Sequence, residues 1–127
     1  MKDILFWIYF FNIILLIIHE IDSGYWKEWV LFKLPGGVNV FLLLHLPMLF
    51  VFLYGLIQIY IFNYLGMIFS FVIVISGIGC FYIHNYYLKR GYKEFNTLIS
   101  LSLIYSILFT SIIQLIVTII SIMNFCT

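Results

Sequence analysis

Charged residues divide the chain into three long uncharged stretches. Asp, Glu, Lys and Arg are absent from residues 4–19, 34–88 and 95–127. Because each charged side chain costs about 2.5–3.5 kcal/mol at the centre of a membrane helix, these stretches indicate transmembrane segments. A span needs about 20 residues, so the middle stretch holds two spans and the last holds one. The first stretch is shorter, and its helix therefore carries Glu20 and Asp22 to the edge of the bilayer or into it.

Turn-forming residues separate the expected helices. Pro35-Gly36-Gly37 and Asn63-Tyr64-Leu65-Gly66 are the places where Pro, Gly and Asn cluster, and these residues favour turns. The expected helices cover about 4–22, 38–60, 65–88 and 97–123. The prediction is an all-α, four-helix transmembrane bundle that forms a single integral membrane domain, residues 1–127.

The connection between the first two helices has a composition of its own. Trp26 and Trp29 alternate there with Lys27 and Lys33. Aromatic residues beside cations suit the headgroup layer of a membrane, so we expect a short interfacial helix capped by Ser23. An irregular loop rich in tryptophan is the alternative.

Composition agrees with a membrane protein and narrows its partners. The chain is 65% hydrophobic and 9% charged, with a net charge of +1, whereas ordinary soluble domains are about 45–50% apolar and 25% charged. No basic patch is present, so nucleic acid is excluded as a partner. The lipid bilayer is the expected partner.

Orientation follows from the positions of the cations. The first and third connections contain Lys27, Lys33, Lys89, Arg90 and Lys93. The other side contains only Lys2 and the amino terminus. The positive-inside rule then predicts a multi-pass protein of the cell membrane with these two connections in the cytoplasm and both termini outside.

Small and hydroxyl residues mark one face on each of the last two helices. The third helix has Gly66, Ser70, Gly77, Cys80 and His84, and the fourth has Ser102, Ser106, Thr110, Gln114 and Thr118. Such faces are typical of helix packing in lipid. We interpret both as structural.

The three histidines share one half of the bilayer. At 1.5 Å per residue, His19, His45 and His84 lie about 5, 12 and 7 Å from the cytoplasmic ends of their helices. Sequence position does not force this agreement, because neighbouring helices run in opposite directions. Glu20 and Asp22 lie at the same level. Ionisable groups at such depth indicate a functional site.

Three imidazoles and a carboxylate are a donor set for a divalent metal, with zinc favoured and iron or manganese as alternatives. His19 and Asp22 are three residues apart and share a helix face, which favours Asp22 over Glu20 as the fourth ligand beside His45 and His84. Glu20 would then act as general base toward a metal-bound water. His19-Glu20 matches only the first half of the H-E-x-x-H zinc-protease pattern, because residue 23 is serine.

Other functions remain open for the same residues. A metal-free polar network satisfies His19, His45 and His84 equally well. A binding module is a second alternative, in which Trp26, Trp29 and Asn85, with the tyrosines of the third helix, hold a lipid or another amphiphile. A structural subunit that forms a homo-oligomer or joins a larger membrane partner is the third.

Short motifs in the first half of the chain resemble those of a known group. They are His19-Glu20-Ile21-Asp22, Glu28-Trp29 and Leu43-Leu44-His45-Leu46-Pro47. They resemble an uncharacterised family of small bacterial membrane proteins with four helices, and more loosely the HXXEE membrane family, although this chain has no Glu-Glu pair. The resemblance implies a bacterial inner membrane location and supplies no activity.

Overall fold

The computed structural model describes residues 1–125 and is helical, with no strand in that range. Its elements are α1 (Lys2–Tyr25), α2 (Glu28–Leu31), α3 (Gly37–Ile61), α4 (Tyr64–Lys89) and α5 (Leu98–Phe125). The four long helices are long and apolar enough to cross a membrane. The predicted all-α, four-helix bundle with a short helix after the first span is therefore confirmed.

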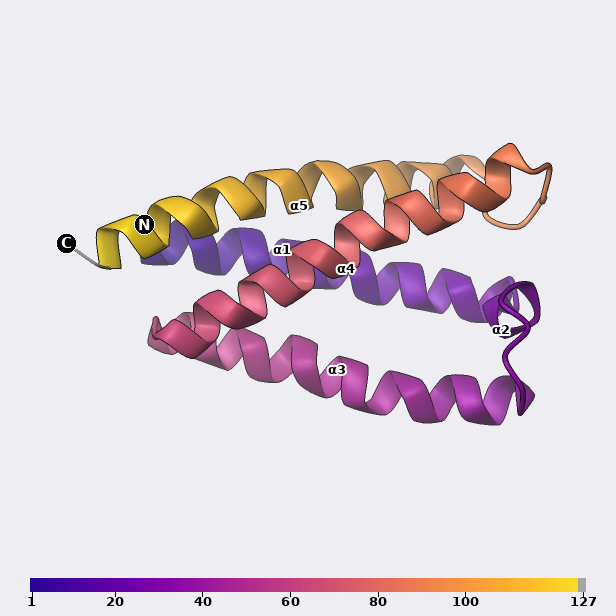
Figure 1. Cartoon of the computed structure of the whole chain (residues 1–127), viewed down its shortest axis with the longest axis horizontal. Helices are drawn as coiled ribbons and strands as arrows, with labels where there is room; N and C mark the ends of the chain where they lie inside the picture. Colours follow the sequence, from indigo (N-terminus) through magenta and orange to yellow (C-terminus); the bar gives the residue numbers. More distant parts are fainter. Residues whose placement is uncertain (126–127) are drawn as a thin grey trace.

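The long helices run alternately up and down (Figure 1). The start of α1 and the end of α5 lie at one end of the bundle, and α2 and the α4–α5 connection lie at the other, which we call the α2 end. Helix α4 crosses between α3 and α5 and packs against both, while α1 contacts α3, α4 and α5. The α2 end therefore contains the last turns of α1 and α4 and the first turns of α3 and α5, together with α2.

The first span is longer than expected, and this changes the role of Ser23. Helix α1 continues to Tyr25, so Ser23 lies inside it and is buried. Helix α2 starts after Lys27, whose backbone is left-handed (φ 53°) and which makes no side-chain cap. The expected cap at Ser23 is wrong, because the helix that precedes it does not end there.

A chain of hydrogen bonds joins α1, α4 and α5 in the middle of the bundle. The Asn12 side-chain amide donates to Ser111 Oγ (3.1 Å) and to Gln114 Oε1 (2.7 Å). Gln114 Nε2 in turn donates to Ser70 Oγ (2.9 Å), whose hydroxyl pairs with that of Thr118 (2.7 Å). All five residues are buried. Apart from Asn12 Oδ1, which has no hydrogen-bond partner, these groups pair with one another, which supports the structural interpretation of Ser70, Gln114 and Thr118. Ser102 and Ser106 are exposed, so the expected packing face of the last helix does not extend to them.

Candidate functional site

Two of the three histidines meet inside the α2 end. The rings of His19 on α1 and His84 on α4 lie edge to face, with centroids 4.5 Å apart. They are only 2% and 3% exposed. Cys80 lies one turn before His84, and its sulfur is 3.8 Å from Nδ1 of that histidine. The expected approach of His19 and His84 is thus present, with a thiol beside them.

These three residues form a group with metal-ligand spacing. One donor atom from each of His19, Cys80 and His84 lies within 4.8 Å of the others. Among the described residues, Nδ1 of His19 and Nε2 of His84 are buried nitrogens without a hydrogen-bond partner. Because native structures pair nearly all buried polar atoms, two such nitrogens at one place need an explanation.

Hydrogen bonding fixes which nitrogen of His84 is available. Its Nδ1 lies 2.8 Å from the carbonyl oxygen of Cys80. A carbonyl only accepts, so Nδ1 carries a proton and donates it. In the neutral ring Nε2 then has a free lone pair, which is the state that binds a metal. The carbonyl also holds the ring in place, as an outer partner of a metal-bound histidine does.

Helix α2 adds a carboxylate to this group. Oε1 of Glu28 lies 3.2 Å from Nε2 of His84, although the direction is not that of a hydrogen bond. Burial raises the pKa of Glu28, but its close contact with His84 and the charges of His84 and His19 outweigh burial and hold that pKa below its ordinary value. Glu28 therefore faces the two histidines as an anion.

The third histidine, His45, pairs with the carboxylate of Glu20. Nε2 of His45 lies 2.7 Å from Oε2 of Glu20, and Nδ1 lies 2.6 Å from the carbonyl oxygen of Phe41. Both ring nitrogens are engaged, so His45 lies outside the group of His19, Cys80 and His84. Glu20 also interacts electrostatically with Glu28 and His84. The two His–carboxylate pairs therefore belong to one charged cluster.

The other predicted site residues lie around this cluster rather than within it. Asp22 is half-buried with an unpartnered Oδ2, and Trp26 has an unpartnered Nε1. The ring of Trp29 packs on Phe41, 5.0 Å between centroids. Asn85 lines a separate hollow. Asp22 as a metal ligand, and Trp26, Trp29 and Asn85 as ligand-binding residues, remain predictions.

An aromatic side chain from the α4–α5 connection covers the histidines. Phe95 is 1% exposed, and its ring centroid lies 4.4 Å from that of His84 and 5.7 Å from that of His19. Its backbone is left-handed (φ 64°), which is unfavourable for a bulky residue and occurs where the surrounding packing imposes it. Phe95 shields the cluster from water at the α2 end.

Two residues of the site were not assigned chemistry from the sequence. The sequence places Cys80 in the packing face of its helix, and Glu28 enters only through the Glu28-Trp29 motif of the resemblance. The i, i+4 spacing of Cys80 and His84 is the signal that could have identified Cys80 as a ligand, since such residues share a helix face. No sequence spacing predicts the contact of Glu28 with His84, because the two residues lie on different helices.

Comparison with known proteins gives a family without an assigned role. Residues 5–121 match the model of a group whose description is "Family of unknown function (DUF6713)". No curated protein and no solved structure matches the chain. The matched range includes every residue of the site.

Proposed function

The chain belongs to the family of unknown function DUF6713, and we propose that it is a membrane protein that binds zinc or another first-row divalent metal through His19, Cys80 and His84. One observation carries the proposal. Donor atoms of these residues lie within 4.8 Å of one another, and two of the imidazole nitrogens are buried without a hydrogen-bond partner.

The donor set favours zinc among these metals. Two imidazoles and a thiolate are typical zinc ligands, whereas manganese prefers oxygen. The iron alternative keeps the same ligands. Glu28 supplies a fourth donor, because its carboxylate already lies 3.2 Å from His84 Nε2.

Charge balance also supports a metal at this depth. A divalent cation with the Cys80 thiolate and the Glu28 carboxylate makes a neutral group. Isolated charges within a membrane protein are costly, so a neutral cluster suits the interior of the bundle. A metal-free network is the second candidate, in which a protonated His84 forms an ion pair with Glu28; the same 3.2 Å contact favours it.

Catalysis is a further step of the proposal. Glu20 is the candidate general base toward a metal-bound water, and its contact with His45 gives it a partner for proton exchange. The substrate would reach the site from the membrane. The location we propose is the bacterial inner membrane, with the α2 end in the cytoplasm, because that end holds most of the cations.

The test is the metal content of the detergent-purified protein, measured by elemental mass spectrometry after supply of zinc. We expect about one zinc per chain in the wild type and at least a fivefold loss in Cys80→Ser and His84→Gln. Substitution with Co²⁺ gives a second readout, since the absorption band of a cobalt–thiolate bond should disappear in Cys80→Ser. Circular dichroism confirms that each variant is folded.

Two matched controls make the ligand set specific. His45→Gln removes the histidine that pairs with Glu20, and Cys126→Ser removes the other cysteine of the chain. Both should keep the metal. A loss in His45→Gln equal to that in Cys80→Ser would replace this ligand set with the His19, His45, His84 and Asp22 set. A folded wild type without metal would leave the ion-paired network as the explanation.

A further inference from the structure

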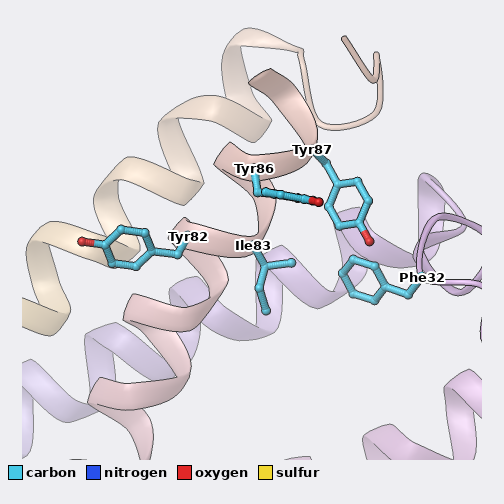
Figure 2. Close-up of a pocket in the computed structure, with 5 residues that line it drawn as sticks. All are labelled: Phe32, Tyr82, Ile83, Tyr86 and Tyr87. Atoms are coloured by element: carbon cyan, nitrogen blue, oxygen red, sulfur yellow. The ribbon is translucent and has the colours of Figure 1, made fainter. Parts of the chain in front are cut away.

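An apolar hollow lies on the outer side of α4 at the α2 end. Its volume is about 480 Å³, and it is lined by Phe32, Tyr82, Ile83, Tyr86 and Tyr87 (Figure 2). Figure 2 shows Phe32, from the segment after α2, facing Tyr87 of α4; their ring centroids are 5.5 Å apart. This volume is within the range of ligand sites, about 300–1,000 Å³.

A second hollow adjoins the first and is flanked by cations. It has a volume of about 260 Å³ and shares Phe32, Tyr86 and Tyr87 with the apolar hollow. Lys33 and Arg90 also line it, and no carboxylate does among the described residues. The Arg90 guanidinium lies over the ring of Tyr86, 4.4 Å from its centroid. The combined surface is therefore cationic at one end and aromatic and aliphatic at the other.

The two hollows are ordered along the membrane normal. Arg90 caps the end of α4 at Lys89, and Lys33 follows α2 at the same end of the bundle. Ile83 precedes Arg90 by seven positions, so it lies about 10 Å deeper at 1.5 Å per residue. A lipid in a bilayer has the same order, with its headgroup at the interface and its chains in the hydrocarbon core.

We infer that this surface binds one bilayer phospholipid with an anionic headgroup. Lys33 and Arg90 hold the phosphate by charge-assisted hydrogen bonds, and an acyl chain follows Ile83 and Tyr82 into the membrane. The lack of a lining carboxylate favours an anionic headgroup over a zwitterionic one. A symmetric dimer through this face is disfavoured, since it would bring the cations of both copies together.

The lipid site borders the histidine cluster without depending on it. The ring centroid of Phe32 lies 6.4 Å from that of His84, so Phe32 is a wall of the groove on one side and a neighbour of the cluster on the other. The inference rests on the shape and charge of the groove. It therefore holds or fails whether or not the cluster binds a metal.

Native mass spectrometry of the detergent-solubilised protein tests the lipid site. The probes are phosphatidylglycerol and phosphatidylcholine with identical acyl chains, added at equal concentrations. We expect the wild type to retain phosphatidylglycerol preferentially as a single adduct. In the double variant Lys33→Gln/Arg90→Gln we expect about a thirtyfold weaker affinity, from about 1 kcal/mol for each cation.

The control variant is Lys89→Gln/Lys93→Gln, which removes the same net charge from a different hollow. It should keep the preference. Equal retention of the two lipids by the wild type, or an equal loss in both double variants, would overturn the inference, because it would show a general effect of charge.

A second pair of variants tests the apolar part of the groove. Ile83→Trp fills the hollow, and Ile75→Trp places the same ring on an exposed position of the same helix. We expect the first to reduce lipid retention at least fivefold and the second to leave it unchanged. Loss of a dimer in Ile83→Trp, with unchanged lipid retention, would assign the groove to a second copy of the chain instead.

Discussion

Both ring nitrogens of His45 face oxygen atoms, one of them on Glu20. Nε2 lies 2.7 Å from the Glu20 carboxylate, while Nδ1 lies 2.6 Å from the Phe41 carbonyl. A carbonyl accepts only, so Nδ1 donates to it, and a second proton must lie between Nε2 and Glu20. The pair is therefore either an imidazolium with a carboxylate or a neutral imidazole with a carboxylic acid. In both states it ties α1 to α3.

The effects of removing the two members of this pair should not be additive. Glu20→Gln and His45→Gln each leave a half-buried polar group with a poorer partner, and we expect each to lower the free energy of unfolding by about 1–3 kcal/mol. The double variant should lose clearly less than the sum of the two. Titration with a denaturing detergent, followed by circular dichroism, measures all three values.

The exposed neighbour Leu46 provides the control for this cycle. Leu46→Ala lies next to His45 and should change the unfolding free energy by less than about 0.5 kcal/mol. Strict additivity of Glu20→Gln and His45→Gln would mean that the two side chains do not interact in the folded protein.

The contact between Glu28 and His84 should make stability depend on pH. The interactions with His84 and His19 hold the pKa of Glu28 below its ordinary value of 4.5, against the opposing effect of burial. A carboxylate with a lowered pKa in the folded state stabilises the protein fully above the unfolded value. This contribution is lost as the pH falls below 4.5 and through the folded pKa. Thermal unfolding between pH 7 and pH 3 should show the loss.

Glu28→Gln isolates this carboxylate from the others. The variant should be less stable than the wild type at neutral pH, and the difference should shrink as the pH falls below 4.5, because the wild type then also carries a neutral side chain. A difference that stays constant over the whole range would mean that ionised Glu28 contributes nothing to stability.

The fold was predictable because it depends mainly on the order of charged and apolar residues along the sequence. The spacing of charged residues sets the number of spans, and the turns at Gly36 and Asn63 follow from local chemistry. Asn63 indeed caps α4 by accepting the N–H of Gly66 (2.8 Å). The depth of the histidines could also be calculated, since the rise per residue is fixed.

The contacts within the site depend on helix rotation, which spacing alone does not give. The spacing predicts that His45 lies in the same half of the bilayer as His19 and His84, yet its ring faces Glu20. Cys80 lies on a helix face of mostly small residues, a pattern that predicts a helix-packing surface rather than a ligand. Glu28 reaches His84 only because α1 continues past Ser23 and sets where α2 begins. Tertiary packing determines each of these contacts.

The orientation of the bundle is a prediction of the positive-inside rule. We expect a single cysteine introduced at Tyr92, in the exposed α4–α5 connection, to be labelled by a membrane-impermeant thiol reagent only after the cell membrane is opened. Both native cysteines are first replaced by serine. A cysteine in place of the exposed Asp3, at the other end of the bundle, should show the opposite pattern. Labelling of the Tyr92 position in intact cells would reverse the orientation.

The hydrogen-bonded chain in the bundle should depend on Gln114. Gln114→Leu leaves Asn12 and Ser70 without their shared partner, and we expect a loss of about 1–2 kcal/mol in unfolding free energy, at the upper end of interhelical hydrogen bonds in membranes. Ser102→Ala is the control. Ser102 is exposed, and its hydroxyl donates to the Leu98 carbonyl within its own helix (2.7 Å), so the change should be under about 0.5 kcal/mol. Equal effects of the two variants would show that these interhelical hydrogen bonds do not stabilise the protein.

Gly77 of α4 lies close against two side chains of α5. A methyl group added at Gly77 would lie 2.0 Å from Ser111 Oγ and 3.1 Å from a methyl of Ile107. Because Ser111 Cβ, which is fixed to the α5 backbone, would also lie only 3.2 Å away, Gly77→Ala should force the helices apart and destabilise the protein by about 1–3 kcal/mol. Gly79→Ala is a matched control on the same helix, since nothing lies within 4 Å of its added methyl. That variant should be neutral or stabilising, because alanine favours the helix over glycine by about 1 kcal/mol. Denaturing-detergent titrations compare the two, and Ser111→Gly should restore part of the loss in Gly77→Ala by removing the nearest atoms. If both alanine variants were equally stable, the α4–α5 contact would have to be looser than the structure has it.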